Sequence, residues 1–537
     1  MAEIVPMLIQ SIVFDRKASE DTAVICADTG LSFSYADVAR LAEQFAWMLR
    51  CAGLKSSDRV AILLPGSIEF VSALFGILRA SAVAAPIDLY MKREEMLSLL
   101  GVIRPQVLVT NQSLFRKIRA EVDGLNVCLL GYNDTLSVSF AVSGLPEMGA
   151  GGTRIELDSP RPCPSEDAVL IMSSGSTGIP KAVRLSHRAI ANNIRMHLES
   201  LHIDERIRGL QLLPMNFSYG LVASFLSILY SGGTAVIYPY IEPGPVLATI
   251  RKYDINVFMG TPALFQYLLE KGGHENDFGA SPLRYLTIGG DRCKRYVTDL
   301  IRRRIPAAKV FITYGLSETG PRVSTLPHEF VDELPHSVGR PLNGVEVSIL
   351  DPDGCNCPPY ETGEIVVSTV SLMNGYFADP ERTKRAIRGG RCYTGDIGYL
   401  DERGFLYISG RNDCQFKFGG RKVNPAFIEQ CICSHPSVQE VSVTKIDTER
   451  HEVLRAFIRA GDTRGGTLLD ELKRLCRKHM PAYMVPAEFV FQDGDLYYHK
   501  GKVFNPIKEE LPAGTSCAAA SPQNALHDGK ESKTGLN

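Results

Sequence analysis

The chain has 537 residues, and its 58 Lys and Arg against 60 Asp and Glu give a net charge of −2. Nucleic-acid-binding proteins usually carry a basic excess, so this balance argues against that class and we expect no nucleic-acid partner. The hydrophobic share of 45% and the charged share of 22% are typical of globular proteins and exclude a collagen-like or wholly disordered chain. At about 150 residues per domain, the length predicts several domains.

Thirteen cysteines are spread along the chain, which excludes a small disulfide scaffold. The close pairs Cys355/Cys357 and Cys431/Cys433 lack the two-residue spacer of zinc and redox motifs, so we expect incidental thiols in a reducing compartment. The N-terminus has no basic run, and Pro6 and Gln10 interrupt its apolar stretch. We therefore predict no signal peptide and a cytoplasmic location.

Residues 209–241 contain no charged residue and are long enough to span a bilayer. However, Pro214, Asn216, Ser218 and the pair Gly232-Gly233 interrupt them. Interruptions this dense favour a packed core, with a buried helix over 218–230 and a strand over 234–240, above the alternative of a transmembrane helix. We expect no integral membrane association.

Strand-like apolar runs alternate with amphipathic helical runs through the first 400 residues. This alternation predicts parallel sheets covered by helices, with ligands at the turns that end the strands. A helix is expected over 67–81, and strands over 59–65, 107–111, 168–174, 257–260, 283–290 and 309–315. The strand over 168–174 is expected to run into a Gly/Ser loop and then into a helix beginning near Ser186.

After residue 338, short strands separated by Asp/Gly turns predict an antiparallel, small barrel-like β region. A further α+β pattern has helices over 424–435 and 467–480 and strands over 438–446, 452–460 and 487–492. We therefore predict an α/β fold with a large N-terminal domain over 1–410 and a small mobile C-terminal domain over 411–511. Residues 512–537 are poor in large apolar residues, and we expect a disordered tail.

The sharpest local signal is the loop Ser173-Ser174-Gly175-Ser176-Thr177-Gly178-Ile179-Pro180-Lys181. Its small residues let backbone amides and hydroxyls approach phosphate oxygens, and Lys181 adds positive charge. It is not a Walker loop, because G-x-x-x-x-G-K-[ST] is absent. A phosphate-binding loop is favoured above the alternative of a flexible linker.

This loop resembles the phosphate loop of the AMP-forming acyl/aryl-acid ligase superfamily, which includes acyl-CoA synthetases, peptide-synthetase adenylation domains and firefly luciferase. The resemblance covers residues 10 to 511, and further motifs follow in the family's order. It implies that a carboxylic acid is adenylated with MgATP and that pyrophosphate is released. CoA, carrier-protein pantetheine or an amine would then accept the acyl group.

Residues 314–319 resemble the family's Tyr-Gly-x-Thr-Glu motif. The resemblance implies that Tyr314, followed by Gly315, stacks on adenine, that the Ser317 hydroxyl binds the α-phosphate, and that Glu318 holds Mg²⁺. Further motifs imply that Gly289 and Gly290 form a turn that lines the adenine and acyl sites. They also imply that the Asp396 carboxylate binds ribose and that the Arg411 cation contacts ribose or phosphate.

The C-terminal motifs imply a mobile unit. By resemblance, Asp413 is the hinge, and Lys417, Gly419 and Gly420 belong to the loop that approaches the acceptor. Lys502 would stabilise the charge that moves between carboxylate and α-phosphate. Its surroundings depart from the family pattern, with Leu496, Tyr498 and Lys500 where proline, threonine and asparagine are usual.

The absence of a carboxylate in residues 214–221 predicts the class of the acid. Peptide-synthetase domains hold the α-amino group of their substrate with an aspartate here, and this chain has no carboxylate in the segment. Because a buried unpaired ammonium is costly, we expect an apolar or aromatic acid without an α-amino group. The expected acyl pocket consists of Phe217, Tyr219, Gly260, Thr261, Ile288, Gly289 and Leu316.

The acceptor stays open. Phe217 replaces a histidine that many CoA ligases carry, and Phe427 replaces an acid after the acceptor loop. A thioester-forming ligase is favoured, with an amide-forming ligase as the alternative. A third hypothesis, a relative that has lost catalysis, is disfavoured because the chain retains Lys181, Glu318, Asp396, Arg411 and Lys502.

Overall fold

The computed structural model describes residues 7–504, except 92, 121, 123–124, 134, 141–162, 164–165, 174–180, 273–277, 412–415, 419–420, 424, 448–451, 462–465, 481, 493–496 and 500–501. The chain divides into two compact units, Met1–Gln415 and Phe416–Asn537. The mixed α/β architecture of the two units confirms the predicted fold class. The tail expected over 512–537 lies outside the described residues.

The first sheet of the larger unit is mostly parallel. In the described residues its strands follow the order β7-β6-β5-β3-β4-β8-β9. Antiparallel pairs close both edges, β6 with β7 and β8 with β9. The strands are β3 (Arg59–Leu63), β4 (Val83–Pro86), β5 (Val107–Thr110), β6 (Val127–Asn133), β7 (Thr135–Phe140), β8 (Asp167–Ser173) and β9 (Lys181–Ser186).

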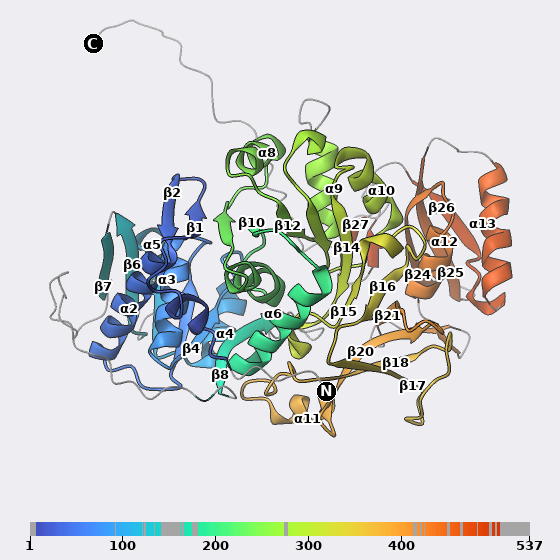
Figure 1. Ribbon diagram of the computed structural model, residues 1–537. Helices are drawn as coiled ribbons and strands as arrows, with labels where there is room; N and C mark the ends of the chain where they lie inside the picture. Colours follow the sequence, from blue (N-terminus) through green and yellow to red (C-terminus); the bar gives the residue numbers. More distant parts are fainter. Residues whose placement is uncertain are drawn as a thin grey trace, which may run out of the picture. The chain divides into compact units, whose positions relative to one another are not determined.

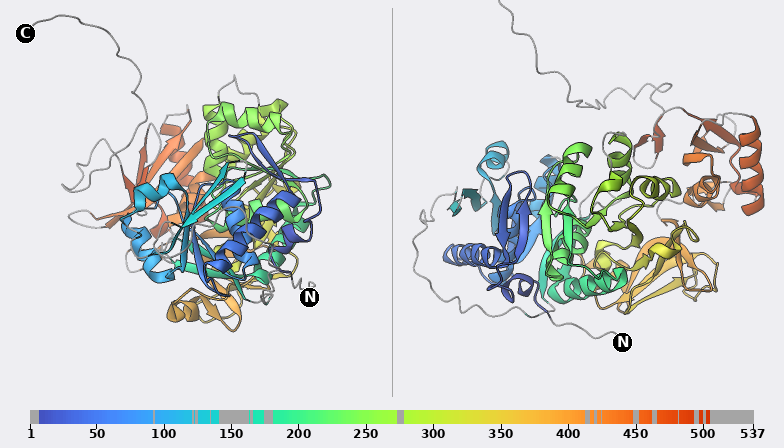
Figure 2. Two further views of the ribbon diagram at one scale, coloured as in Figure 1. Left: turned by 90° about the vertical axis from the view of Figure 1, so that its left-hand side faces the viewer. Right: turned by 45° about the horizontal axis from the view of Figure 1, so that its top comes forward.

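The second sheet has a parallel part, and the ends of its strands carry several of the predicted site residues. It contains β1 (Thr22–Cys26), β10 (Arg208–Gln211), β11 (Thr234–Ile237), β12 (Val257–Gly260), β13 (Tyr285–Ile288) and β14 (Lys309–Tyr314), with β2 (Leu31–Ser34) antiparallel at the edge. Strand β1 pairs in parallel with β11, so the blue and green segments lie side by side in Figures 1 and 2.

The same sheet continues through antiparallel strands. Strand β14 pairs with β15, β15 with β16, and β16 with β21, which joins the expected antiparallel region to the parallel part. The strands are β15 (Ser324–Leu326), β16 (Ser337–Pro341), β17 (Val345–Leu350), β18 (Gly363–Thr369), β19 (Ile387–Arg388), β20 (Arg391–Leu400) and β21 (Leu406–Arg411).

Helices form layers on both sheets. The helices are α1 (Ser11–Phe14), α2 (Tyr35–Cys51), α3 (Ile68–Arg79), α4 (Arg93–Ile103), α5 (Gln112–Ile118), α6 (His187–Leu201), the π-helix η1 (Tyr219–Leu226), α7 (Ser227–Tyr230), α8 (Pro243–Lys252), α9 (Pro262–Lys271), α10 (Arg295–Arg304) and α11 (Pro380–Ala386), with 3₁₀ turns η2 (Phe278–Ala280), η3 (Ser317–Thr319) and η4 (His328–Phe330).

The alternation of side chains along each strand determines which helices it contacts. On β13, Tyr285 packs into a core with α2, α3, α6 and η1, whereas Leu286 and Ile288 pack into a second core with α8, α9 and α10. Figure 1 shows α9 and α10 beside β12 and β14. Helices α2, α3, α6 and η1 therefore share a core between the two sheets, because residues of β3 and β8 belong to it as well.

One predicted connection lacks a strand that the structure shows. The strand over 168–174 was expected to run into the Gly/Ser loop and then into a helix beginning near Ser186, and this helix is observed. Strand β9 comes first and pairs with β8 in antiparallel register, with Ser173 opposite Lys181. Helix α6 then begins at His187, where the Ser186 side chain caps it by accepting a hydrogen bond from the Ala189 N–H at 3.1 Å.

The uncharged segment 209–241 is now accounted for. It contains β10, η1, α7 and β11, which confirms the expected packed helix and strand. Throughout the residues that the structure describes, no helix combines the length and the apolar character needed to cross a membrane.

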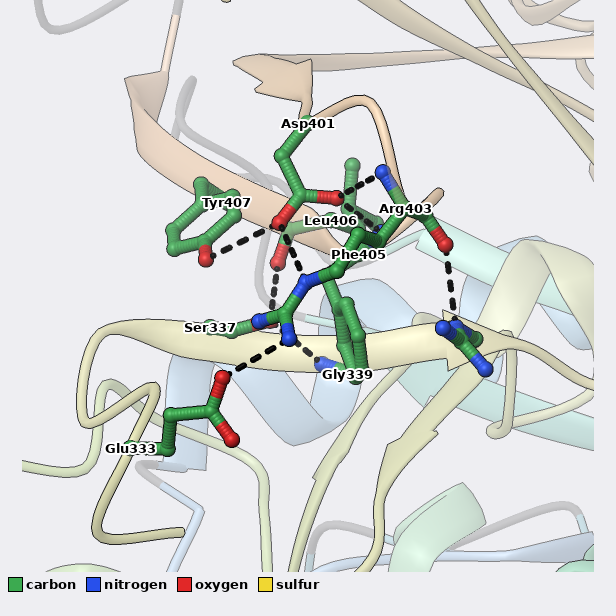
Figure 3. Close-up of polar contacts among 9 residues, drawn as sticks. Glu333, Ser337, Gly339, Asp401, Arg403, Phe405, Leu406 and Tyr407 are labelled. Atoms are coloured by element: carbon green, nitrogen blue, oxygen red, sulfur yellow. Dashed lines mark hydrogen bonds and ion pairs between the residues drawn. The ribbon is translucent and has the colours of Figure 1, made fainter. Parts of the chain in front are cut away.

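A polar network fixes the hairpin of β20 and β21 (Figure 3). The Asp401 carboxylate accepts backbone hydrogen bonds from Arg403 at 3.0 Å and Phe405 at 2.8 Å. Arg403 also pairs with Glu333 at 2.7 Å. Ser337 of β16 donates to the Leu406 carbonyl at 2.9 Å. This network holds the hairpin that carries Asp396 and Arg411 against β16.

The smaller unit is an α+β assembly in which β24, β25 and β26 form a sheet. Helices α12 and α13 contribute Ile428, Leu472 and Cys476 to its core. Its described elements are β22 (Phe416–Phe418), β23 (Arg421–Val423), α12 (Pro425–Cys433), β24 (Val438–Asp447), β25 (Glu452–Ala460), α13 (Gly466–His479), η6 (Ala482–Met484), β26 (Glu488–Phe491), β27 (Tyr497–His499) and β28 (Lys502–Phe504).

Candidate active site

The carboxyl ends of three parallel strands bring the predicted motifs to one edge of the second sheet. Gly260 on β12 is in register with Ile288 on β13, and β13 pairs in parallel with β14. The turn Gly289-Gly290 follows β13, and Gly315 follows β14. A Cβ atom on Gly289 would lie 2.4 Å from Thr313 Oγ1, so only glycine fits there. Ligand sites in open α/β sheets commonly lie at such an edge.

Tyr314, Asp396 and Arg411 meet at this edge. The Tyr314 hydroxyl donates to Asp396 Oδ2 at 2.6 Å, and Arg411 Nη1 lies 3.4 Å from Asp396 Oδ1. Burial, together with the Asp396 charge, raises the pKa of Tyr314 well above its ordinary value, so it stays a neutral donor. The carboxylate is mostly buried while Arg411 is half exposed, an arrangement suited to a ligand that carries hydroxyl groups.

Lys181, Tyr376 and Glu318 form a second group. The Tyr376 hydroxyl donates to Glu318 Oε1 at 2.8 Å, and Lys181 Nζ lies 5.3 Å from the centre of the Tyr376 ring. Burial and Glu318 raise the pKa of Tyr376, which keeps the hydroxyl protonated. Residues 374–377 pair with β9, and this pairing places Tyr376 beside Lys181. The sequence analysis missed Tyr376.

The Ser317 hydroxyl is held by a partner that the sequence analysis did not assign. Ser317 Oγ and Ser218 Oγ are 2.8 Å apart. Gln211 at the end of β10 fixes the neighbouring start of η1 by donating to the carbonyls of Leu213 at 2.6 Å and Gly220 at 3.2 Å. Because π-helical segments occur often at functional sites, η1 is itself consistent with a site here.

Tyr219 begins η1 and crosses to the strand ends. Its hydroxyl donates to the carbonyl oxygens of Gly260 and Thr287, each at 3.1 Å, and its ring lies near Gly289 and Gly290. Thr261 caps α9, and its side chain also lies near Gly290. Phe217 is 44% exposed.

Two other residues of the expected acyl pocket lie in hydrophobic clusters. Ile288 is fully buried in the core with α9 and α10, on the face opposite Thr287, so its side chain does not meet Tyr219. Leu316 packs against the antiparallel part of the sheet.

Several predicted residues lie outside the described part. These are Ser174, Gly175, Ser176, Thr177 and Gly178 of the loop, and Asp413, Gly419 and Gly420. Ser173, Lys417 and Lys502 lie in strands β8, β22 and β28, and only their backbone positions are described.

The donor set at Glu318 fits a hard divalent cation. Tyr376 engages Oε1, and among the described residues no hydrogen bond or ion pair engages Oε2. A carboxylate oxygen beside phosphate oxygens is the ligand type that Mg²⁺ prefers. Elsewhere the described residues hold no group of three or more His, Cys, Asp and Glu that could bind a metal.

The fold and these motifs define an adenylate-forming enzyme. The AMP-binding enzyme family matches residues 13–377, and the AMP-binding enzyme C-terminal domain matches residues 428–498. The first match covers more than half of the chain. The chain therefore belongs to the AMP-binding enzyme family, as its motifs predicted, and is an AMP-forming carboxylic acid ligase.

Two similar proteins are named as carboxylic acid–CoA ligases. The 2-succinylbenzoate–CoA ligase of Geobacillus kaustophilus (strain HTA426) is 30% identical over 470 residues, which cover 86% of this chain and 89% of the relative. The 4-coumarate–CoA ligase 4 of Arabidopsis thaliana is 28% identical over 480 residues, which cover 87% and 84%. Both names describe ligases that join an aromatic acid to CoA.

A solved structure matches both units. The o-succinylbenzoate CoA synthetase of Bacillus subtilis, in complex with its acyl-adenylate intermediate, has a TM-score of 0.73 and 25% identity, over 93% of this chain and 98% of the other. Bound to ATP and a magnesium ion, the same enzyme has a TM-score of 0.73 and 26% identity, over 90% and 96%.

Proposed function

We propose that this enzyme converts an apolar or aromatic carboxylic acid without an α-amino group into its acyl-adenylate, using MgATP, and transfers the acyl group to CoA. One observation carries the proposal. The strand ends bring a nucleotide-type group (Tyr314, Asp396 and Arg411) to the same edge as Ser317 and Glu318. This arrangement provides separate places for a sugar, a phosphate and a cation.

The first step joins the acid to AMP. A carboxylate oxygen attacks the α-phosphorus of ATP, the bond from that phosphorus to the bridging oxygen breaks, and pyrophosphate leaves with the electron pair. Ser317, held by Ser218, donates to an α-phosphate oxygen, and Lys181 neutralises phosphate charge together with the loop from Ser173 to Gly178. Lys502 stabilises the negative charge as it moves between the two substrates.

Glu318 would hold Mg²⁺, which when bound would neutralise the pyrophosphate charge. Tyr376 keeps the carboxylate oriented through its hydrogen bond to Oε1, which leaves Oε2 as the oxygen that would bind the cation. On the nucleotide, Asp396 accepts hydrogen bonds from the ribose hydroxyls, and Tyr314 stacks on adenine while its hydroxyl is tied to Asp396. Arg411 contacts ribose or phosphate.

The second step transfers the acyl group. The CoA thiol loses its proton and attacks the acyl carbonyl carbon, the carbonyl-to-phosphate oxygen bond breaks, and AMP leaves. Relatives named as CoA ligases support CoA as acceptor. We place Asp413 at the hinge and Lys417, Gly419 and Gly420 on the acceptor side. Phe217 replaces a histidine that many CoA ligases carry, and this departure keeps an amine acceptor and an amide product as the second candidate.

The test is a panel of acids with ATP and Mg²⁺. Aromatic acids, fatty acids and α-amino acids are supplied in turn, pyrophosphate release is followed, and products with CoA or with amines are identified by mass. The proposal expects release with aromatic or apolar acids and an acyl-CoA product. A strong preference for free α-amino acids would contradict the acid class, and amides formed in preference to thioesters would replace CoA as the acceptor.

A further inference from the structure

Arg322 is a buried cation without a counter-ion. It is 2% exposed, and its Nη1 donates to the Pro321 carbonyl at 3.0 Å. Among the described residues, its Nε and Nη2 atoms have no hydrogen-bond partner. Within the part of the chain that the structure describes, no carboxylate forms an ion pair with Arg322. Two charged donors are therefore left unused inside the protein.

The neighbours of Arg322 do not supply a charge. Its guanidinium carbon lies 4.0 Å from the centre of the Tyr219 ring. His197 on α6 is fully buried, and no described residue is hydrogen-bonded to either ring nitrogen. Burial together with Arg322 lowers the pKa of His197 well below the ordinary value, so the ring is neutral. Asn193 donates through Nδ2 to the Arg322 carbonyl at 2.8 Å, while its Oδ1 has no hydrogen-bond partner in the described part of the chain.

These four residues, Arg322, Tyr219, His197 and Asn193, are the Arg322 cluster. A guanidinium that is desolvated without an anion lowers stability, and an apolar side chain of similar volume is often the more stable choice. The planar N–H donors of a guanidinium can form two parallel hydrogen bonds to the two oxygens of one carboxylate. The buried charge of the cluster is therefore better explained by binding an anionic group of a ligand than by a contribution to folding stability.

The position of the cluster identifies the ligand as the acid. Tyr219 connects Arg322 to the expected acyl side, because its hydroxyl is bonded to Gly260 and Thr287 at the strand ends. The adjacent Ser218 contacts Ser317, where the reacting carboxylate is placed in the proposed function. An acid bound along Ser218 and Tyr219 thus has its reacting end at Ser317 and its distal end toward Arg322.

We infer that the acid carries a second acidic group, a carboxylate distant from the one that is activated, and that Arg322 is the residue that selects it. This inference rests on the proposed function, because it assigns the substrate class of the same site.

The test compares acids that differ only in the second carboxylate. The pairs are 2-succinylbenzoate with 3-benzoylpropionate, and 4-carboxycinnamate with cinnamate, each measured by pyrophosphate release. The wild-type enzyme should prefer the diacid of a pair by about ten- to hundredfold in kcat/KM, as expected for a charged hydrogen-bonded contact. Arg322→Met should remove this preference by raising the KM of the diacid. The kcat/KM of the monoacid should stay within about threefold of its wild-type value.

Arg322→Lys is the matched variant, because it keeps the charge without the fork and should keep part of the preference. Thermal unfolding shows whether each variant is folded. If wild type used both acids of each pair equally, or if Arg322→Met slowed diacid and monoacid alike, Arg322 would not select an anion, although the ligase function would stand. If neither these acids nor the broad panel gave pyrophosphate release, the proposed function itself would fail.

Discussion

Replacing Tyr376 with phenylalanine removes one hydroxyl from the candidate site and leaves the ring beside Lys181 in place. That hydroxyl donates to Glu318 Oε1 at 2.8 Å. A hydrogen bond to a charged group contributes about 1.5–3 kcal/mol. Glu318 is only partly buried, so a hydrogen bond from water can replace part of the lost interaction. We therefore take the lower value of about 1.5 kcal/mol. Since about 1.4 kcal/mol is a factor of ten, kcat/KM for pyrophosphate release should fall about tenfold.

The loss should depend on magnesium, because the hydroxyl orients the carboxylate that holds the cation. Tyr376→Phe should therefore need more Mg²⁺ for half-maximal rate. Tyr285→Phe is the matched control, since its hydroxyl donates to Asp204 at 2.5 Å, on a strand whose opposite end carries the site. The control should keep the wild-type Mg²⁺ dependence. Wild-type kcat/KM and Mg²⁺ dependence in Tyr376→Phe would refute the positioning role.

Three further changes test other parts of the account. Asp396→Asn keeps an acceptor for Tyr314 but removes the charge, so KM for ATP should rise about tenfold with kcat within about threefold; an unchanged KM would contradict ribose binding by Asp396. Lys502→Ala should slow pyrophosphate release by about a hundredfold and leave the reaction of a preformed acyl-adenylate with CoA unaffected, whereas unaltered release would mean that another lysine acts. Burial lowers the pKa of His187 to about 4, below the value of 6.5 in the unfolded chain, so the unfolded state takes up the proton first. Chemical unfolding should therefore show stability falling by about 3 kcal/mol between pH 6.5 and pH 4, and His187→Asn should flatten this slope; an equal slope in both proteins would exclude His187 as the cause.

Local patterns predicted most elements because their signals are local. The helix over 67–81 is observed as α3, with Ser67 capping its start by accepting a hydrogen bond from the Phe70 N–H. Strand β9 was missed, because it begins with Lys181 after a Gly/Ser loop and is stabilised by pairing with β8 and with residues 374–377. Such pairing between distant segments leaves little trace in a local pattern.

The same limit applies to the site. Motifs contiguous in sequence, such as 314–319, could be found, and the structure brings Tyr314 together with Asp396 and Arg411. Tyr376 and Ser218 were not assigned, because their partners Glu318 and Ser317 are far away along the chain. For Arg322 a signal existed in the sequence, since an arginine stands three residues after the 314–319 motif, but only the structure shows that the described residues leave its charge without a counter-ion.

The most direct test of the central claim follows one oxygen atom. The acid is supplied with isotopically labelled carboxylate oxygen, together with ATP, Mg²⁺ and CoA, and the products are analysed by mass. An acyl-adenylate intermediate predicts one labelled oxygen in AMP for each acyl-CoA formed, because the carboxylate oxygen that attacks the α-phosphorus leaves with it. Label in inorganic phosphate, with ADP as the nucleotide product, would contradict the account.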